Sequence, residues 1–241
     1  YAADADRDEL FHCDDRHVMI PGTLAGVAKT DPELAFKLLP ETGTNKAQVI
    51  GLIAEAAGSP DDRTATLTAF RSYLTTVSDP EERESLHKKV LEGFVESLSR
   101  ESFATATTWM TGQDLSAAER DELVRALPEE ATIEEPGKWI EWMAGALPPE
   151  KLGERVDALI GAWAGKDCHA VAKWLGEQPD GPARTAAVRA YADTVAGHDP
   201  QVAAEWAMTL PAGETRQDTL EQIYRKWPDD DIAARAAFAA E

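Results

Sequence analysis

The sequence has few cysteines, and their scarcity already excludes one class of protein. Only Cys13 and Cys168 occur among its 241 residues, too few for a disulfide scaffold and not spaced as metal ligands are. A single bridge between them would need an oxidising compartment. Cysteine content therefore leaves the compartment open.

Long apolar runs and surplus positive charge are also missing. Charged residues, glycine or proline interrupt every apolar run before it reaches the length of a membrane span, so we expect no membrane insertion within this chain. The formal net charge is −20, from 24 Lys and Arg against 44 Asp and Glu. Phosphate neutralisation needs clustered basic residues, so we expect no nucleic-acid partner. Acidity on this scale favours a soluble monomer.

Motifs that carry catalysis or hold a cofactor are absent from the sequence as well. It contains no phosphate-binding glycine loop, no nucleophile elbow and no His-Glu-x-x-His pattern. Donor atoms gather near the amino terminus at His12, Cys13 and His17, but their spacing matches no compact metal site. We therefore predict no catalytic residue, no metal and no cofactor.

The carboxy-terminal half of the sequence contains a pattern that recurs every 32 residues. Trp142, Trp174, Trp206 and Phe238 follow one another at this spacing. An acid precedes each aromatic by seven residues: Glu135, Asp167, Asp199 and Asp231. Several apolar positions keep the same register, which indicates a structural repeat.

Each 32-residue unit is typical of two helices. The acid fits an N-cap, whose side-chain oxygen accepts hydrogen bonds from the free amides of the first turn. Pro136 and Pro200 follow their acids at the one helical position where a missing N–H does no harm. We predict helix pairs at 135–166, 167–198 and 199–230. Because the tryptophans lie on apolar stripes, we expect them in the core.

The amino-terminal half follows the same rules less regularly. Caps followed by proline occur at Asp31 and Asp79, and Ser116 begins a capping box with Glu119. No segment alternates as a strand would. We predict an all-α fold, a right-handed α-solenoid of antiparallel helix pairs with about six pairs plus a terminal helix.

This solenoid would be one continuous domain with three parts. They are an amino-terminal extension with the first helix (1–30), irregular helical repeats (31–134), and regular repeats that end in a capping half-repeat (135–241).

The segment from Asp199 to Arg216 carries the most complete copy of the repeat, Asp-Pro-x-x-Ala-x-x-Trp followed by Leu-Pro-x-Gly-x-x-Arg. It resembles the tryptophan-marked α-helical repeats of bacterial proteins and is broadly similar to tetratricopeptide-like and HEAT-like solenoids. The period of 32 departs from the tetratricopeptide consensus. The resemblance implies a binding or scaffolding role, and it carries over no catalytic residue.

Three basic residues are the candidate binding residues: Lys46, Arg184 and Arg216. Each follows a glycine by three positions, and a row of such groups would bind carboxylates along a groove. The alternative is that they pair with acids of the adjoining unit and fix the stacking. Cys168 follows the cap Asp167 and precedes His169; it is either a reactive thiol or a residue that this position tolerates.

These observations favour a non-enzymatic scaffold that binds a protein or peptide. Two alternatives remain open: an α/α-barrel-type glycan-active enzyme with paired carboxylates, and a structural spacer of an exported assembly. The chain begins at Tyr1, as it would after loss of an export signal or after trimming, so the localisation is unknown.

Overall fold

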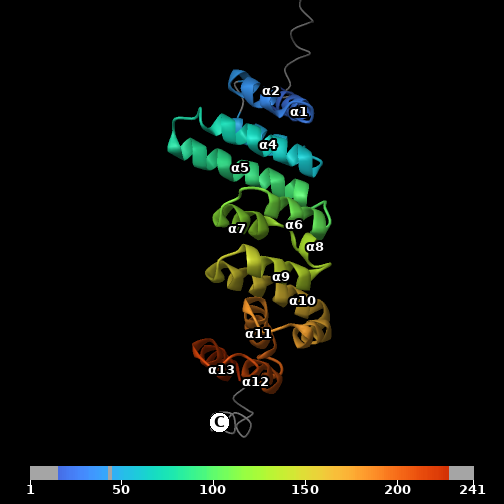
Figure 1. Cartoon of the computed structure of the whole chain (residues 1–241), viewed down its shortest axis with the longest axis vertical. Coiled ribbons are helices and arrows are strands. Elements are labelled where there is room, and N and C mark those ends of the chain that lie inside the picture. Colours follow the sequence, from blue (N-terminus) through green and yellow to red (C-terminus); the bar gives the residue numbers. More distant parts are fainter. Residues whose placement is uncertain (1–15, 43–44, 228–241) are drawn as a thin grey trace, which may run out of the picture. The chain divides into compact units, whose positions relative to one another are not determined.

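The computed structural model describes residues 16–42 and 45–227, and within these ranges it contains helices and no strand. The prediction of an all-α fold is confirmed. The chain divides into two compact units, Tyr1–Leu115 and Ser116–Glu241, here called the amino-terminal and the carboxy-terminal unit. Figure 1 traces the helices of both.

The amino-terminal unit contains six described α-helices and one short 3-10 helix. They are α1 (Arg16–Ala28), α2 (Pro32–Leu38), η1 (Leu39–Thr42), α3 (Lys46–Glu55), α4 (Pro60–Leu74), α5 (Pro80–Leu98) and α6 (Phe103–Gly112).

The carboxy-terminal unit contains seven described helices. They are α7 (Ala117–Ala126), α8 (Glu129–Thr132), α9 (Pro136–Ala146), α10 (Pro149–Glu177), α11 (Pro182–Val195), α12 (Pro200–Met208) and α13 (Glu214–Lys226). Within α10 the backbone leaves the helical region at Asp167, with φ −154° and ψ 90°. Two helical parts, 149–166 and 168–177, therefore meet at this residue.

Side-chain caps explain where many helices begin. Four residues precede a proline and accept a hydrogen bond from a backbone N–H of the first turn: Asp31, Ser59, Asp79 and Asp199. The capping box predicted at Ser116 and Glu119 is confirmed, with both of its hydrogen bonds present. Free amides of the first turn are thereby satisfied by side chains close in sequence.

The acids of the 32-residue period do not all act alike. The Asp167 carboxylate accepts from the Ala170 N–H at 2.9 Å, and Asp199 accepts from the Val202 N–H at 3.1 Å. Their N-cap roles are confirmed. The prediction is wrong for Glu135, which makes no cap hydrogen bond and pairs with Lys138 instead. Its side chain is one methylene longer than that of Asp, which is a preferred cap residue.

Aromatic rings form much of the amino-terminal core. The ring of Phe36 lies 5.8 Å from that of Phe70 and 5.7 Å from that of Tyr73, between centroids. Phe94 and Trp109 are 5.3 Å apart in the same measure. These buried rings come from four helices, α2, α4, α5 and α6.

Glycine permits a close approach of α3 and α5. A Cβ on Gly93 would lie 2.7 Å from the Ala54 Cβ and still closer to the carbonyl oxygen of Gly51. Any side chain at this position would therefore push the two helices apart.

A fully buried cation crosses the same core. Arg63 of α4 is 0% exposed and donates from Nη1 to Ser97 Oγ at 2.9 Å and from Nη2 to Glu101 Oε1 at 3.0 Å. Its guanidinium carbon lies 5.7 Å from the ring centroid of Trp109. Ser97 donates in turn to the carbonyl oxygen of Ala57. A buried charge needs such partners, so the network ties α4 to α5 and α6.

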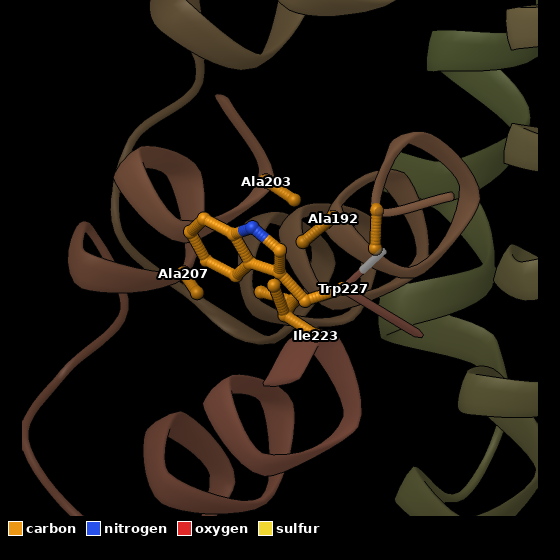
Figure 2. Packing of buried hydrophobic residues seen from close by; sticks show 6 residues of the cluster. Ala192, Ala203, Ala207, Ile223 and Trp227 are labelled. Carbon is orange, nitrogen blue, oxygen red and sulfur yellow. The ribbon is translucent and has the colours of Figure 1, made fainter. Parts of the chain in front are cut away.

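Small side chains dominate the carboxy-terminal core where α11, α12 and α13 meet. Ala192, Ala203 and Ala207 are all 0% exposed and pack with Ile223 and Trp227. Figure 2 shows the Trp227 indole among these residues. Alanine lets helices approach closely, so one large ring is enough to fill the space that remains.

The prediction that the tryptophans on the apolar stripes lie in the core is confirmed for Trp139 and Trp227 and wrong for the other four. Trp142, Trp163, Trp174 and Trp206 are only partly buried, whereas Trp109, Trp139 and Trp227 are buried. The three indoles of the 32-residue period each pack against another aromatic ring. Alanines occupy much of the core between α11, α12 and α13, and the Trp206 ring of α12 stays partly exposed.

Tyr224 of α13 is an exposed member of the apolar positions that keep the 32-residue register. Its side chain is 38% exposed, although Ile160 and Ala192, which lie 64 and 32 residues earlier, are 0% exposed. Ala192 packs with Ala203 and Ala207 of the following pair. Tyr224 belongs to the last pair that the structure describes.

Some predictions lie outside the described residues. They include the donor atoms around His12 and Cys13 and the half-repeat with Asp231 and Phe238. The division into 1–30, 31–134 and 135–241 also stays a prediction.

Candidate binding surfaces

Lys46, the first of the three predicted binding residues, begins α3 and is paired within the amino-terminal unit. Its Nζ lies 2.8 Å from Glu82 Oε1 of α5. This hydrogen bond is the main cause that raises the pKa of Lys46 above its usual value. The lysine therefore joins two helices in its own unit.

Arg184 and Arg216 lie in the carboxy-terminal unit and contact backbone carbonyls. Arg184 donates to Thr209 Oγ1 at 3.1 Å and to the Thr209 carbonyl oxygen at 3.4 Å, which links α11 to the end of α12. Arg216 donates from Nε to the Leu210 carbonyl oxygen at 2.7 Å. Both side chains thus hold helix ends in place. That either one also binds a ligand carboxylate stays a prediction.

Ion pairs connect successive second helices of the predicted pairs. Three are found in the carboxy-terminal unit: Asp121–Arg155 at 3.0 Å, Asp157–Arg189 at 2.9 Å and Asp193–Lys226 at 2.6 Å. They join α7 to α10, α10 to α11, and α11 to α13. The partners of each ion pair are 32 to 34 residues apart, and this spacing of opposite charges could have predicted the pairs from the sequence.

A surface groove of about 640 Å³ lies along the starts of α10, α11 and α13. Its lining includes Glu150, Glu154, Asp157, Thr185, Arg189 and Thr215. We call it the acidic groove because Arg189, the one basic group in its lining, already pairs with Asp157.

The acidic groove follows the 32-residue register. Four pairs of its lining residues are 32 positions apart: Glu150 and Pro182, Gly153 and Thr185, Glu154 and Ala186, Asp157 and Arg189. The same positions of α10 and α11 therefore form opposite walls. Sequence reasoning missed this surface because it looked for motifs along the chain rather than for equal positions on neighbouring helices.

A second cavity, of about 510 Å³, lies where both parts of α10 meet α11 and the start of α12. Its lining includes Gly161, Gly165, Cys168, His169, Tyr191 and His198. We call it the Tyr191 hollow. Its size is within the usual range for ligand pockets.

The Cys168 thiol contacts a phenol in this hollow. Its Sγ lies 3.0 Å from the Tyr191 hydroxyl oxygen. Burial and, second to it, this hydrogen bond raise the pKa of Tyr191 far above its usual value. A neutral phenol is no base for thiolate formation at neutral pH. Tyr191 therefore does not activate the Cys168 thiol, and this contact does not support the predicted reactive-thiol role of Cys168.

The described residues contain neither a cluster of metal ligands nor a membrane-spanning helix. Within residues 16–42 and 45–227 no three His, Cys, Asp or Glu side chains gather as metal ligands do. In the same ranges no helix is long and apolar enough to cross a membrane.

No family model, curated protein or solved structure matches this chain. Its class is therefore defined by fold and surface alone: an all-α protein whose described carboxy-terminal helices line surface cavities, among them the acidic groove and the Tyr191 hollow.

Proposed function

We propose that this chain is a non-enzymatic scaffold that binds a protein or peptide, built as a right-handed α-solenoid of about six helix pairs and a terminal helix. In this proposal residues 135–230 are three copies of one 32-residue helix pair.

Local geometry supports the repeat. The caps Asp167 and Asp199 have nearly the same backbone angles, φ −154° and ψ 90° against φ −141° and ψ 79°. Each is followed by a first helix, and three ion pairs join the second helices in order, α7 to α10, α10 to α11 and α11 to α13. In a helical repeat every pair contacts its neighbours through equal positions. The Asp157–Arg189 pair, which joins positions 32 apart, fits this rule.

The acidic groove is the observation that carries the binding function. It runs across α10, α11 and α13, so its walls come from segments that are distant in sequence. Stacked helix pairs produce extended surfaces of this kind, which repeat proteins use to bind partners. The exposed Glu150 and Glu154 and the net charge of −20 favour a basic peptide.

A selection of random peptides on the immobilised chain, followed by fluorescence anisotropy with the purified peptides, tests this function. Selected peptides should be rich in Lys and Arg, and their affinity should fall with added salt. Thr185→Trp places an indole in the groove and should weaken binding about tenfold or more. Gln222→Trp adds the same ring to an exposed position of α13 outside the groove lining and should leave the affinity unchanged.

Two results would count against the scaffold. One is a failure to select any saturable binder, or equal binding by both tryptophan variants. The other is turnover of a glycan that disappears in Glu150→Gln, which would favour the glycan-active enzyme in its place.

A further inference from the structure

The Trp174 indole packs where two successive helix pairs meet. The Trp174 ring lies 5.6 Å from that of Trp163, between centroids. It also covers Gly137, because a Cβ at that position would lie 2.8 Å from two carbons of the Trp174 ring. Trp163, Gly137 and Trp174 therefore form a place in which a large aromatic ring is held.

Two of these three positions differ in the next pair, and the third keeps its tryptophan. Thirty-two residues on, Val195 stands for Trp163, His169 for Gly137, and Trp206 for Trp174. Trp206 packs edge-on against Tyr191, with centroids 5.8 Å apart and an interplanar angle of 84°. Both Val195 and His169 line the Tyr191 hollow, and Trp206 is absent from its lining. The hollow thus lies beside the positions that hold an indole one pair earlier.

Glycines keep this hollow open on the side of α10. Gly161 and Gly165 both line it, and a Cβ added to either would meet no other atom within 4 Å. The lining also includes Tyr191 and Val195 of α11 and Val202 of α12. A flat apolar ring matches such a surface.

We propose that the Tyr191 hollow binds an aromatic side chain of a partner peptide against Val195 and His169, whose counterparts Trp163 and Gly137 hold the Trp174 ring one pair earlier. The proposal rests on the peptide-binding function above and adds a second contact to it. His198 and Asp199 stand among the lining residues and supply polar groups for the backbone next to the inserted ring. Asp199 and the acidity of the chain favour basic residues beside the aromatic one.

Titration of the isotope-labelled full chain with capped tripeptides, followed by amide NMR spectra, tests the proposal. Lys-Trp-Lys should shift the amide signals of Val195 and Val202 in a saturable way. Lys-Leu-Lys, which has the same charge, should bind at least about tenfold more weakly. N-acetyl-tryptophanamide should shift the same signals at higher concentration, because it lacks the basic flanks.

Variants that fill the hollow provide the control. Val195→Trp restores the residue type of Trp163 and should abolish the shifts caused by Lys-Trp-Lys. Gly165→Leu fills the hollow from α10, so it keeps the test decisive if the first variant does not fold. Gln222→Trp should bind as the unchanged chain does, since this exposed residue is not part of the lining.

The two proposals fail in different ways. Equal shifts from the tryptophan and leucine peptides, or shifts that persist in both filled variants, would overturn the aromatic site. Signals that stay unmoved at Val195 and Val202 would do the same. Peptides that still bind at the acidic groove in that case would leave the scaffold function standing.

Discussion

The two units of this chain are both helical, yet their cores are built in different ways. The amino-terminal unit buries large rings such as Phe70 and Phe94 and encloses the charged Arg63. In the carboxy-terminal unit, alanines lie between the last three helices and several tryptophans are left half-buried at the edges. The more regular sequence therefore has the shallower aromatic packing. Regular spacing reflects repeated contacts between neighbouring pairs, whereas depth of burial depends on how completely each side chain is covered.

This difference implies different responses to substitution. A core of interlocking rings loses many contacts when one ring is removed. A stack held by caps, ion pairs and small residues distributes its stability over many modest contacts.

The largest loss is expected at Phe94. Phe94→Ala removes a 0% exposed ring that packs against Trp109, and should lower the free energy of unfolding by about 3–5 kcal/mol. Trp206→Ala removes a larger but partly buried ring and should lower it by only about 2 kcal/mol. Urea unfolding, monitored by circular dichroism, measures both. Equal losses would erase the contrast between the two cores.

A smaller loss is expected at Gly137 in α9. Gly137→Ala directs a methyl group into the Trp174 indole, and this overpacking should lower the free energy of unfolding by about 1–3 kcal/mol. Gly145→Ala lies in the same helix, where an added Cβ meets nothing within 4 Å. It should be neutral or stabilising by up to about 1 kcal/mol. Similar unfolding midpoints for both variants would show that Trp174 does not cover Gly137.

The N-caps should contribute about 1 kcal/mol each. Asp167→Ala removes the acceptor for the Ala170 N–H and should lower the free energy of unfolding by roughly that amount. Glu135→Ala, at the equivalent position without a cap bond, should change it by less than about 0.5 kcal/mol. Thermal unfolding of the two variants side by side gives the comparison. A larger loss at Glu135 would contradict the assignment of the caps.

The smallest effect is expected for the ion pairs between second helices. Arg189→Gln breaks the contact with Asp157. The side chains of both residues are partly exposed, so the free energy of unfolding should fall by less than about 1 kcal/mol. Near 1 M salt the difference from the unchanged chain should vanish, because exposed charges are screened over about 3 Å there. A loss that persists in salt would mean that this pair is more than a surface contact.

Much of the fold could be predicted because its signals are local. A cap, a proline and an apolar stripe lie within a few residues of each other, so the starts of α12 at Pro200 and α7 at Ala117 followed from the sequence. The all-α class rests on the same evidence. Chain-distant contacts were beyond this reasoning: Arg63 looks like a surface residue of α4 until Ser97 and Glu101 are placed beside it.

The candidate surfaces were harder to predict than the helices. Lys46, Arg184 and Arg216 share a spacing from glycine, but side-chain partners decide their roles, and these partners lie on other helices or turns. The 32-residue register did contain the walls of the acidic groove. Recognising them required knowledge of which sides of α10 and α11 face each other. The predicted burial of Trp142, Trp163, Trp174 and Trp206 was wrong for a related reason. An apolar stripe on a helix does not reveal how much of its width the neighbouring helices cover.

Native-state hydrogen exchange of the carboxy-terminal unit tests most directly whether it is a stack of repeats. A stack of neighbouring pairs predicts a gradient, in which α12 and α13 open at a lower free energy than α9 and the first part of α10. Ile223→Ala should then accelerate exchange in α12 and α13 and leave α9 unchanged. One common opening free energy for all helices from α7 to α13, lowered equally by this substitution, would contradict the repeat and the scaffold built on it.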